Sequence, residues 1–141
     1  MTLPSFQSTS SAQGRQFAQQ CDALLATYGF LLEGPTKVPG IGVEVDQVAT
    51  SSRGQRVWFE YKGSIQGSRP GLLRTDTLKK AVANGALITA IEEHPPYIVL
   101  TSHLPTAGAG LEMLNTAVAL RYFTDVVCIY DPSDQARLKH L

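Results

Sequence analysis

Apolar and polar residues alternate in two segments of the first half of the chain. The apolar positions of these segments are Ile41, Val43, Val45, Val57, Phe59 and Tyr61, and the positions between them are polar or glycine except for Trp58. A period of two is typical of a β-strand with one covered face. Residues 51–55 (SSRGQ) have turn-forming chemistry. The pattern predicts a β-hairpin over 41–62, preceded by a brief strand over 30–32.

Helical spacing and continuous apolar runs account for most of the remaining chain. They predict helices over 11–28, 75–91 and 111–122, strands over 97–102 and 126–130, and a short final helix. Residues 63–71 are rich in Gly, Ser and Pro and are predicted to form a loop, and residues 1–11 are polar and expected to be flexible. Since the late strands are continuously apolar, we expect them to be covered on both faces. The order α β β β α β α β predicts one α/β domain over 1–141, with a mixed central sheet flanked by helices.

Composition adds few restrictions on function. The chain has 141 residues, 43% of them hydrophobic and 17% charged, which is ordinary for one soluble globular domain. We find no apolar run long enough to cross a bilayer and no secretory signal pattern, so we expect a cytoplasmic protein without a membrane partner. Two distant cysteines and three scattered histidines predict neither a disulfide nor a zinc site.

The distribution of basic residues is uneven, although the net charge is zero. Seven of the twelve Lys and Arg residues lie between Arg53 and Lys80. Such a basic surface can attract a polyanion such as DNA, and the alternative is a solvated loop and helix face. The candidate nucleic-acid contacts are Arg53, Arg69, Arg74, Lys79 and Lys80.

The hairpin places charged side chains on one predicted face. A turn centred on Arg53 sets Asp46 opposite Glu60 and Glu44 opposite Lys62. Two carboxylates directly opposed on a sheet are unfavourable by up to about 1 kcal/mol, and a divalent cation with oxygen ligands removes that conflict. Mg²⁺ suits one or two carboxylates plus a substrate phosphate, and a neighbouring lysine can neutralise a phosphate oxygen or orient a water. These residue types suit phosphodiester hydrolysis.

The strings VEVDQVA (43–49) and VWFEYKGS (57–64) resemble the D…ExK core of the PD-(D/E)XK, or restriction-endonuclease-like, nucleases. Together with the element order, the resemblance covers roughly residues 13–104. It implies the family's αβββαβ core, here with an extra C-terminal helix and strand. It also implies that Asp46, Glu60 and the carbonyl of Tyr61 bind Mg²⁺ or Mn²⁺, and that Lys62 assists the attacking water.

The chain departs from the family pattern in two places. Val45 stands where the family name has proline, and the first helix lacks a well-placed acidic residue. That helix offers Gln13, Gln19 and Gln20 instead, with Asp22 less well placed. Glu33 or Glu44 can take the role of the missing acid.

Supporting roles follow from these departures. The candidates are Glu44, Gln20 and Gln66, the last of which can face the scissile phosphate from the loop.

The resemblance implies a metal-dependent nuclease acting on DNA. Because the small chain leaves little room for a sequence-reading domain, we expect a structure-selective enzyme, such as a junction resolvase or repair nuclease. A homodimer would supply the two sites that cutting both strands requires. One alternative is a catalytically weak or inactive nuclease-fold module that binds nucleic acid or a protein partner. Another is a flavodoxin-like small-molecule binder, although no Gly-rich phosphate loop follows a strand.

Overall fold

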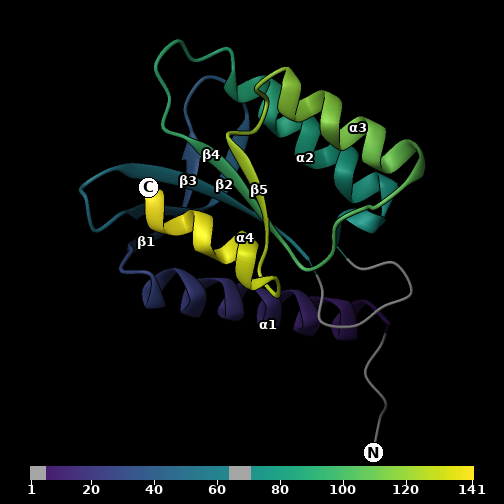
Figure 1. The fold of residues 1–141 in the computed structure, drawn as a ribbon, viewed down its shortest axis with the longest axis horizontal. Helices are drawn as coiled ribbons and strands as arrows, with labels where there is room; N and C mark the ends of the chain where they lie inside the picture. Colours follow the sequence, from purple (N-terminus) through teal and green to yellow (C-terminus); the bar gives the residue numbers. More distant parts are fainter. Residues whose placement is uncertain (1–5, 64–70) are drawn as a thin grey trace, which may run out of the picture.

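The computed structural model describes residues 6–63 and 71–141, which form one mixed β-sheet covered by helices on both faces (Figure 1). The strands are β1 (Leu31–Val38), β2 (Val43–Thr50), β3 (Arg56–Lys62), β4 (Tyr97–Thr101) and β5 (Asp125–Cys128). The α-helices are α1 (Phe6–Thr27), α2 (Thr75–Ile88), α3 (Gly108–Ala119) and α4 (Pro132–Ala136), with short 3-10 turns η1 (Gly71–Leu73) and η2 (Arg137–His140). This order confirms the predicted one.

The sheet follows the order of the chain, β1-β2-β3-β4-β5. The pairs β1/β2 and β2/β3 are antiparallel, whereas β3/β4 and β4/β5 are parallel. The α/β class and the mixed sheet are therefore confirmed. The three antiparallel strands at one end exclude the flavodoxin-like alternative, whose sheet is parallel with order 2-1-3-4-5.

Two hydrophobic cores lie on opposite faces of the sheet. Helices α2 and α3 cover one face, which we name the α2 face, and α1 covers the other, the α1 face (Figure 1). Strand β4 is buried throughout: Tyr97 and Val99 face the first core and Ile98 and Leu100 the second. This double coverage is the reason that its sequence is continuously apolar.

The predicted hairpin register is correct near the turn. The pairs are Gln47 with Phe59, Val48 with Trp58, Ala49 with Val57 and Thr50 with Arg56. Residues 51–55 form the turn, where the Ser51 N–H donates to the Gln55 carbonyl at 2.8 Å. Beyond Gln47 the ladder stops, so the predicted backbone pairs of Asp46 with Glu60 and Glu44 with Lys62 do not form part of it.

A β-bulge in β2 ends the ladder. The partners of Gly34 and Thr36 in β1 are Val48 and Val45 in β2. One residue of β1, Pro35, therefore faces two residues of β2, Asp46 and Gln47. As a result both Val45 and Val48 enter the α2-face core although they are three positions apart. The expectation of one uninterrupted polar face along β2 was wrong, because a bulge shifts the alternation by one residue.

The hairpin also lacks the open face that its alternation predicted. Glu60 is only 3% exposed, because its side chain points into the α2 face. The sequence shows polar residues on that face but cannot show that a helix covers them.

Several element boundaries differ from the prediction. Strand β1 runs to Val38 through Gly34 and Pro35, six residues beyond the end of the predicted strand over 30–32. An edge strand tolerates proline, since one row of its N–H groups needs no partner, and Gly34 adopts a positive φ of 97° beside the bulge. Strand β2 begins at Val43 and continues to Thr50, and β5 begins at Asp125 and ends at Cys128.

The helices shift as well. Helix α1 begins at Phe6, so part of the segment expected to be flexible is helical; it has no glycine or proline from Phe6 to Ala12 to stop a helix. Helix α2 ends at Ile88 and α3 spans Gly108–Ala119, three residues from the predicted bounds. Within residues 6–63 and 71–141, no helix combines the length and apolar character that crossing a membrane requires.

Two glycines bring helices close to the end of the sheet that holds Lys62. A Cβ at Gly63 would overlap the ring of Phe17 in α1. A Cβ at Gly71, where φ is 61°, would overlap the side chains of Thr101 and Ser102. Since Thr101 pairs with Lys62 across the parallel ladder, η1 and the start of α2 lie at this end of the sheet.

Candidate active site

Strand β3 presents the acid and the amine of the ExK sequence on the same face. Residues two apart in a strand point to the same side, so Glu60 and Lys62 are neighbours. The Lys62 Nζ lies 3.1 Å from Glu60 Oε1, and the Tyr97 hydroxyl donates to Glu60 Oε2 at 2.8 Å. Both oxygens of this buried carboxylate therefore have a partner.

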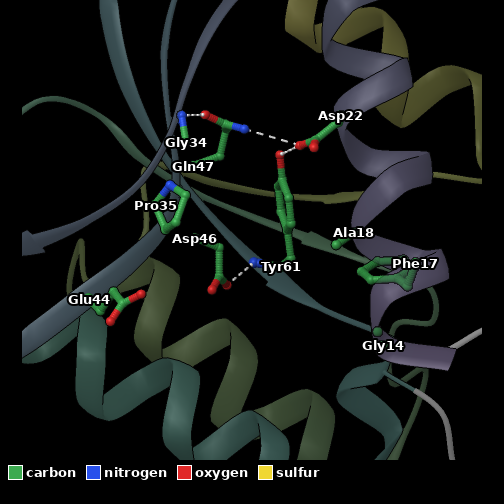
Figure 2. A pocket seen from close by; sticks show the side chains of 11 residues that line it. Gly14, Phe17, Ala18, Asp22, Gly34, Pro35, Glu44, Asp46, Gln47 and Tyr61 are labelled. Carbon is green, nitrogen blue, oxygen red and sulfur yellow. Dashed lines mark hydrogen bonds between the residues drawn. The ribbon is translucent and has the colours of Figure 1, made fainter. Parts of the chain in front are cut away.

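Asp46 approaches the same residues from the bulge of β2. Its Oδ2 accepts the backbone N–H of Tyr61 at 2.8 Å, as Figure 2 shows. In a continued antiparallel ladder that N–H would donate to a backbone carbonyl of β2. The Asp46 carboxylate takes the place of that carbonyl and therefore lies beside Tyr61, the residue between Glu60 and Lys62 in β3. The Tyr61 carbonyl stays a predicted metal ligand.

The electrostatics of the site reflect two carboxylates and one lysine. Burial, followed by the negative charge of Asp46, raises the pKa of Glu60 from 4.5 to about 7. Lys62 and the hydrogen bond from Tyr97 lower this pKa but do not cancel the rise. A titratable group shifted by burial and by a like charge is typical of functional sites.

Asp46 and Glu60 are the two residues of the site that could hold a small divalent cation. Asp46 and Glu60 supply hard oxygen ligands, and Mg²⁺ binds through one or two carboxylates with the remaining positions taken by waters and phosphate oxygens. A cation would also offset the two causes that raise the pKa of Glu60, its burial and the repulsion by Asp46. Across the described part of the chain, no group of three His, Cys, Asp or Glu residues is arranged to hold a metal, so the fit rests on two carboxylates.

A groove of about 510 Å³ opens beside Asp46, between α1 and the first three strands (Figure 2). The helix lines it with Gly14, Phe17, Ala18 and Asp22, and the sheet with Gly34, Pro35, Glu44, Asp46, Gln47, Tyr61 and Gly63. Three carboxylates, those of Asp22, Glu44 and Asp46, line this groove. Its acidity favours a cation over a bare phosphate.

Asp22, which the sequence indicates as less well placed than the family's helix-one acid, lines the groove. Its Oδ1 accepts the Tyr61 hydroxyl at 2.6 Å and Gln47 Nε2 at 3.1 Å. Its spacing was the available signal: Gly14, Ala18 and Asp22 are four residues apart, which puts them on one side of a helix.

The predicted supporting residues lie in different parts of the structure. Glu44 is exposed and lines the groove. Gln20 instead accepts the Tyr130 hydroxyl, because it lies about 200° around α1 from Ala18 and Asp22. Glu33 pairs with Arg56 at the surface. Gln66 lies outside the described residues.

The residues predicted to contact DNA also lie in different parts of the structure. Arg74 precedes α2, and Lys79 and Lys80 are exposed on that helix. Arg53 lies in the β2–β3 turn, at the opposite end of the hairpin from Lys62, because the ExK residues end the strand that the turn begins. Arg69 falls outside the described residues.

The cysteines are free, as expected. Burial, with Asp22 and Asp46 nearby, raises the pKa of the Cys21 thiol far above its usual range. Cys21 is therefore a core residue and not a nucleophile.

No protein family, curated protein or solved structure was found to match this chain.

Proposed function

We propose that this protein is a metal-dependent nuclease with a restriction-endonuclease-like core, which hydrolyses phosphodiester bonds in DNA. One observation carries the proposal: a glutamate is ion-paired to a lysine two residues away, and its pKa is raised first by burial and then by an aspartate from the neighbouring strand. The order α1-β1-β2-β3-α2-β4 with three antiparallel strands and one parallel strand also supports it.

Each residue has a distinct task in this proposal. Asp46 and Glu60 would hold Mg²⁺, which when bound polarises the phosphoryl group and lowers the pKa of a bound water. Tyr97 holds one oxygen of Glu60 through its hydroxyl. The Lys62 side chain is 21% exposed, so its ammonium can leave Glu60 to contact a phosphate oxygen or orient the attacking water.

The start of α2 supplies positive charge at the same end of the sheet. Gly71 packs on Thr101, the β4 partner of Lys62, and Arg74 follows three residues later. An exposed arginine there can contact a DNA phosphate, while Lys79 and Lys80 extend the positive field along the helix. A structure-selective substrate, such as branched DNA, remains our expectation for a chain of this size.

The test is cleavage of linear and four-way-junction DNA with Mg²⁺ or Mn²⁺, and without metal. We expect metal-dependent cleavage that falls by about 100-fold or more in Lys62→Ala, since a positioned acid–base or charge-stabilising group contributes that much. Arg56→Ala is the matched control, because Arg56 is a basic residue of the same strand in an exposed pair with Glu33. Cleavage without metal, or undiminished cleavage by Lys62→Ala, would contradict the proposal.

A non-catalytic module is the second candidate. The observation that favours it is that Glu60 already uses one oxygen for Lys62 and the other for Tyr97, so a cation has to compete for them. In this case the same DNA substrates would be bound but remain intact at every metal concentration. Gel-shift and cleavage measurements on the same samples distinguish the two candidates.

A further inference from the structure

The wall of the groove carries a hydrogen-bond network that the proposed reaction does not use directly. Asp22 of α1 receives the Tyr61 hydroxyl from β3 and the Gln47 amide from β2 at a single oxygen, Oδ1 (Figure 2). The carbonyl oxygen of the Gln47 side chain in turn accepts the backbone N–H of Gly34 in β1. One helix carboxylate thereby connects three adjacent strands.

This network surrounds Asp46 on two sides. Gln47 follows Asp46 in the chain and is the second residue of the bulge. Tyr61 donates its backbone N–H to Asp46 and its hydroxyl to Asp22. Any movement of either neighbour away from α1 changes the direction in which the Asp46 carboxylate points.

The bulge needs such support, because side chains replace backbone contacts there. The Tyr61 N–H bonds a carboxylate and the Gly34 N–H bonds a side-chain amide, where a regular ladder would offer backbone carbonyls. Side chains have more conformational freedom than the backbone of a ladder, so the positions of the Asp46 and Gln47 side chains depend on the residues that bond them. Gln47 is 4% exposed, and burial makes its lost hydrogen bonds costly.

We propose that Asp22 is a positioning residue, which fixes the carboxylate of Asp46 through Tyr61 and Gln47 and does not itself bind the metal. The inference rests on the proposed function for its catalytic consequence. Asp22, the acidic residue of the first helix, then positions a metal ligand and is not itself a ligand.

The decisive variants are Asp22→Asn, Asp22→Ala and Tyr61→Phe. Asparagine keeps an oxygen acceptor but loses the negative charge that makes a carboxylate a strong ligand of a divalent cation. We expect Asp22→Asn to keep kcat within about threefold of the wild type, and Asp22→Ala and Tyr61→Phe to lose about 10- to 100-fold in kcat, with KM for DNA unchanged. The double variant Asp22→Ala/Tyr61→Phe should be no worse than Asp22→Ala alone, because that single variant already removes the acceptor of the Tyr61 hydroxyl.

A metal-ligand role predicts the opposite pattern. Asp22→Asn would then lose as much activity and Mn²⁺ affinity as Asp22→Ala, while Tyr61→Phe would keep both. Calorimetric titration with Mn²⁺ alone measures the Mn²⁺ affinity of each variant directly. Tyr28→Phe is the matched control, since it removes a hydroxyl from a tyrosine packed at the same α1-face core.

A second measurement uses the protein without metal or DNA. Hydrogen exchange of the Tyr61 backbone amide reports its bond to Asp46. We expect exchange at least about tenfold faster in Asp22→Ala and Tyr61→Phe and unchanged in Asp22→Asn, since a lost bond worth about 1.4 kcal/mol opens the amide tenfold more often. Unchanged exchange in all variants would overturn the inference. If the wild type cleaves no DNA, the proposed function fails while this measurement still decides the role of Asp22.

Discussion

Two clusters in this protein each combine two carboxylates with one basic residue, and they behave differently. In the C-terminal cluster, Arg137 contacts Asp125 through Nε at 2.9 Å and through Nη2 at 3.2 Å, and Asp134 through Nη1 at 2.8 Å. Asp134 also accepts the Cys128 N–H at 2.9 Å. Both acids bond the same guanidinium, and the pKa of Arg137 is raised, chiefly by its hydrogen bonds to Asp125.

At the candidate active site, the lysine is paired with only one acid. Lys62 contacts Glu60, while Asp46 is held by a backbone N–H and adds to the negative field at Glu60. The planar guanidinium of arginine can serve two carboxylates at once, whereas an ammonium is a compact point charge. The geometry of neutralisation, more than the number of charges, separates the two clusters: Arg137 hydrogen-bonds both of its acids, whereas Glu60 keeps a raised pKa beside its lysine.

The largest expected difference between the two clusters lies in how each makes the free energy of unfolding depend on pH. Because Glu60 has a pKa of about 7 when folded and 4.5 ordinarily, the unfolded chain releases this proton first as pH rises. The stability that the Glu60 carboxyl contributes is fully present below pH 4.5 and falls by roughly 3 kcal/mol as pH rises through 7. Glu60→Gln should remove this decline. Urea unfolding of both proteins from pH 4 to about 8.5 measures the difference.

The control for that experiment is Glu33→Gln, which changes an exposed acid paired with Arg56. Its stability should follow the wild-type curve with pH. A Glu60→Gln protein whose stability declines with pH as steeply as the wild type would show that Glu60 does not differ from an ordinary surface carboxylate.

Removal of the arginine should weaken the C-terminal cluster next. Arg137→Ala leaves two aspartates without their shared cation and the Val126 carbonyl without its 2.9 Å donor. We expect a loss of about 1–2 kcal/mol in the free energy of unfolding, because the pair is partly exposed. Metal-dependent cleavage, measured at a temperature where the variant is folded, should not change. Lys139→Ala, an exposed neighbour, should change neither quantity; a cleavage defect in Arg137→Ala alone would end the distinction between the clusters.

The smallest effect is the response to a divalent cation. Mn²⁺ at ten times its Kd should stabilise the wild type by about 1.4 kcal/mol, since it binds only the folded state. Thermal unfolding at pH 7.5 should show this gain, and Asp46→Asn should abolish it. Asp125→Asn removes a carboxylate from the other cluster and should keep it. Equal stabilisation of both variants would mean that the cation does not bind at Asp46.

Much of the hairpin could be predicted because its signals are local. The SSRGQ turn and the alternation of β3 gave the correct register for four pairs from Gln47 to Thr50. The bulge could not be predicted in this way, because it depends on pairing with β1, a strand whose Gly34 and Pro35 read as a stop signal. Edge position makes proline tolerable in β1, and edge position is a property of the whole sheet.

Strand periodicity alone makes Glu60 and Lys62 neighbours, since two residues two apart in a strand share a face wherever that strand lies. The burial of Glu60 on the α2 face, its bond to Tyr97 and the approach of Asp46 through the bulge depend instead on contacts between distant segments. Asp22 and Tyr61 meet across 39 residues of chain. Such contacts depend on how helices and strands pack together, and no periodicity within one segment encodes the position of another.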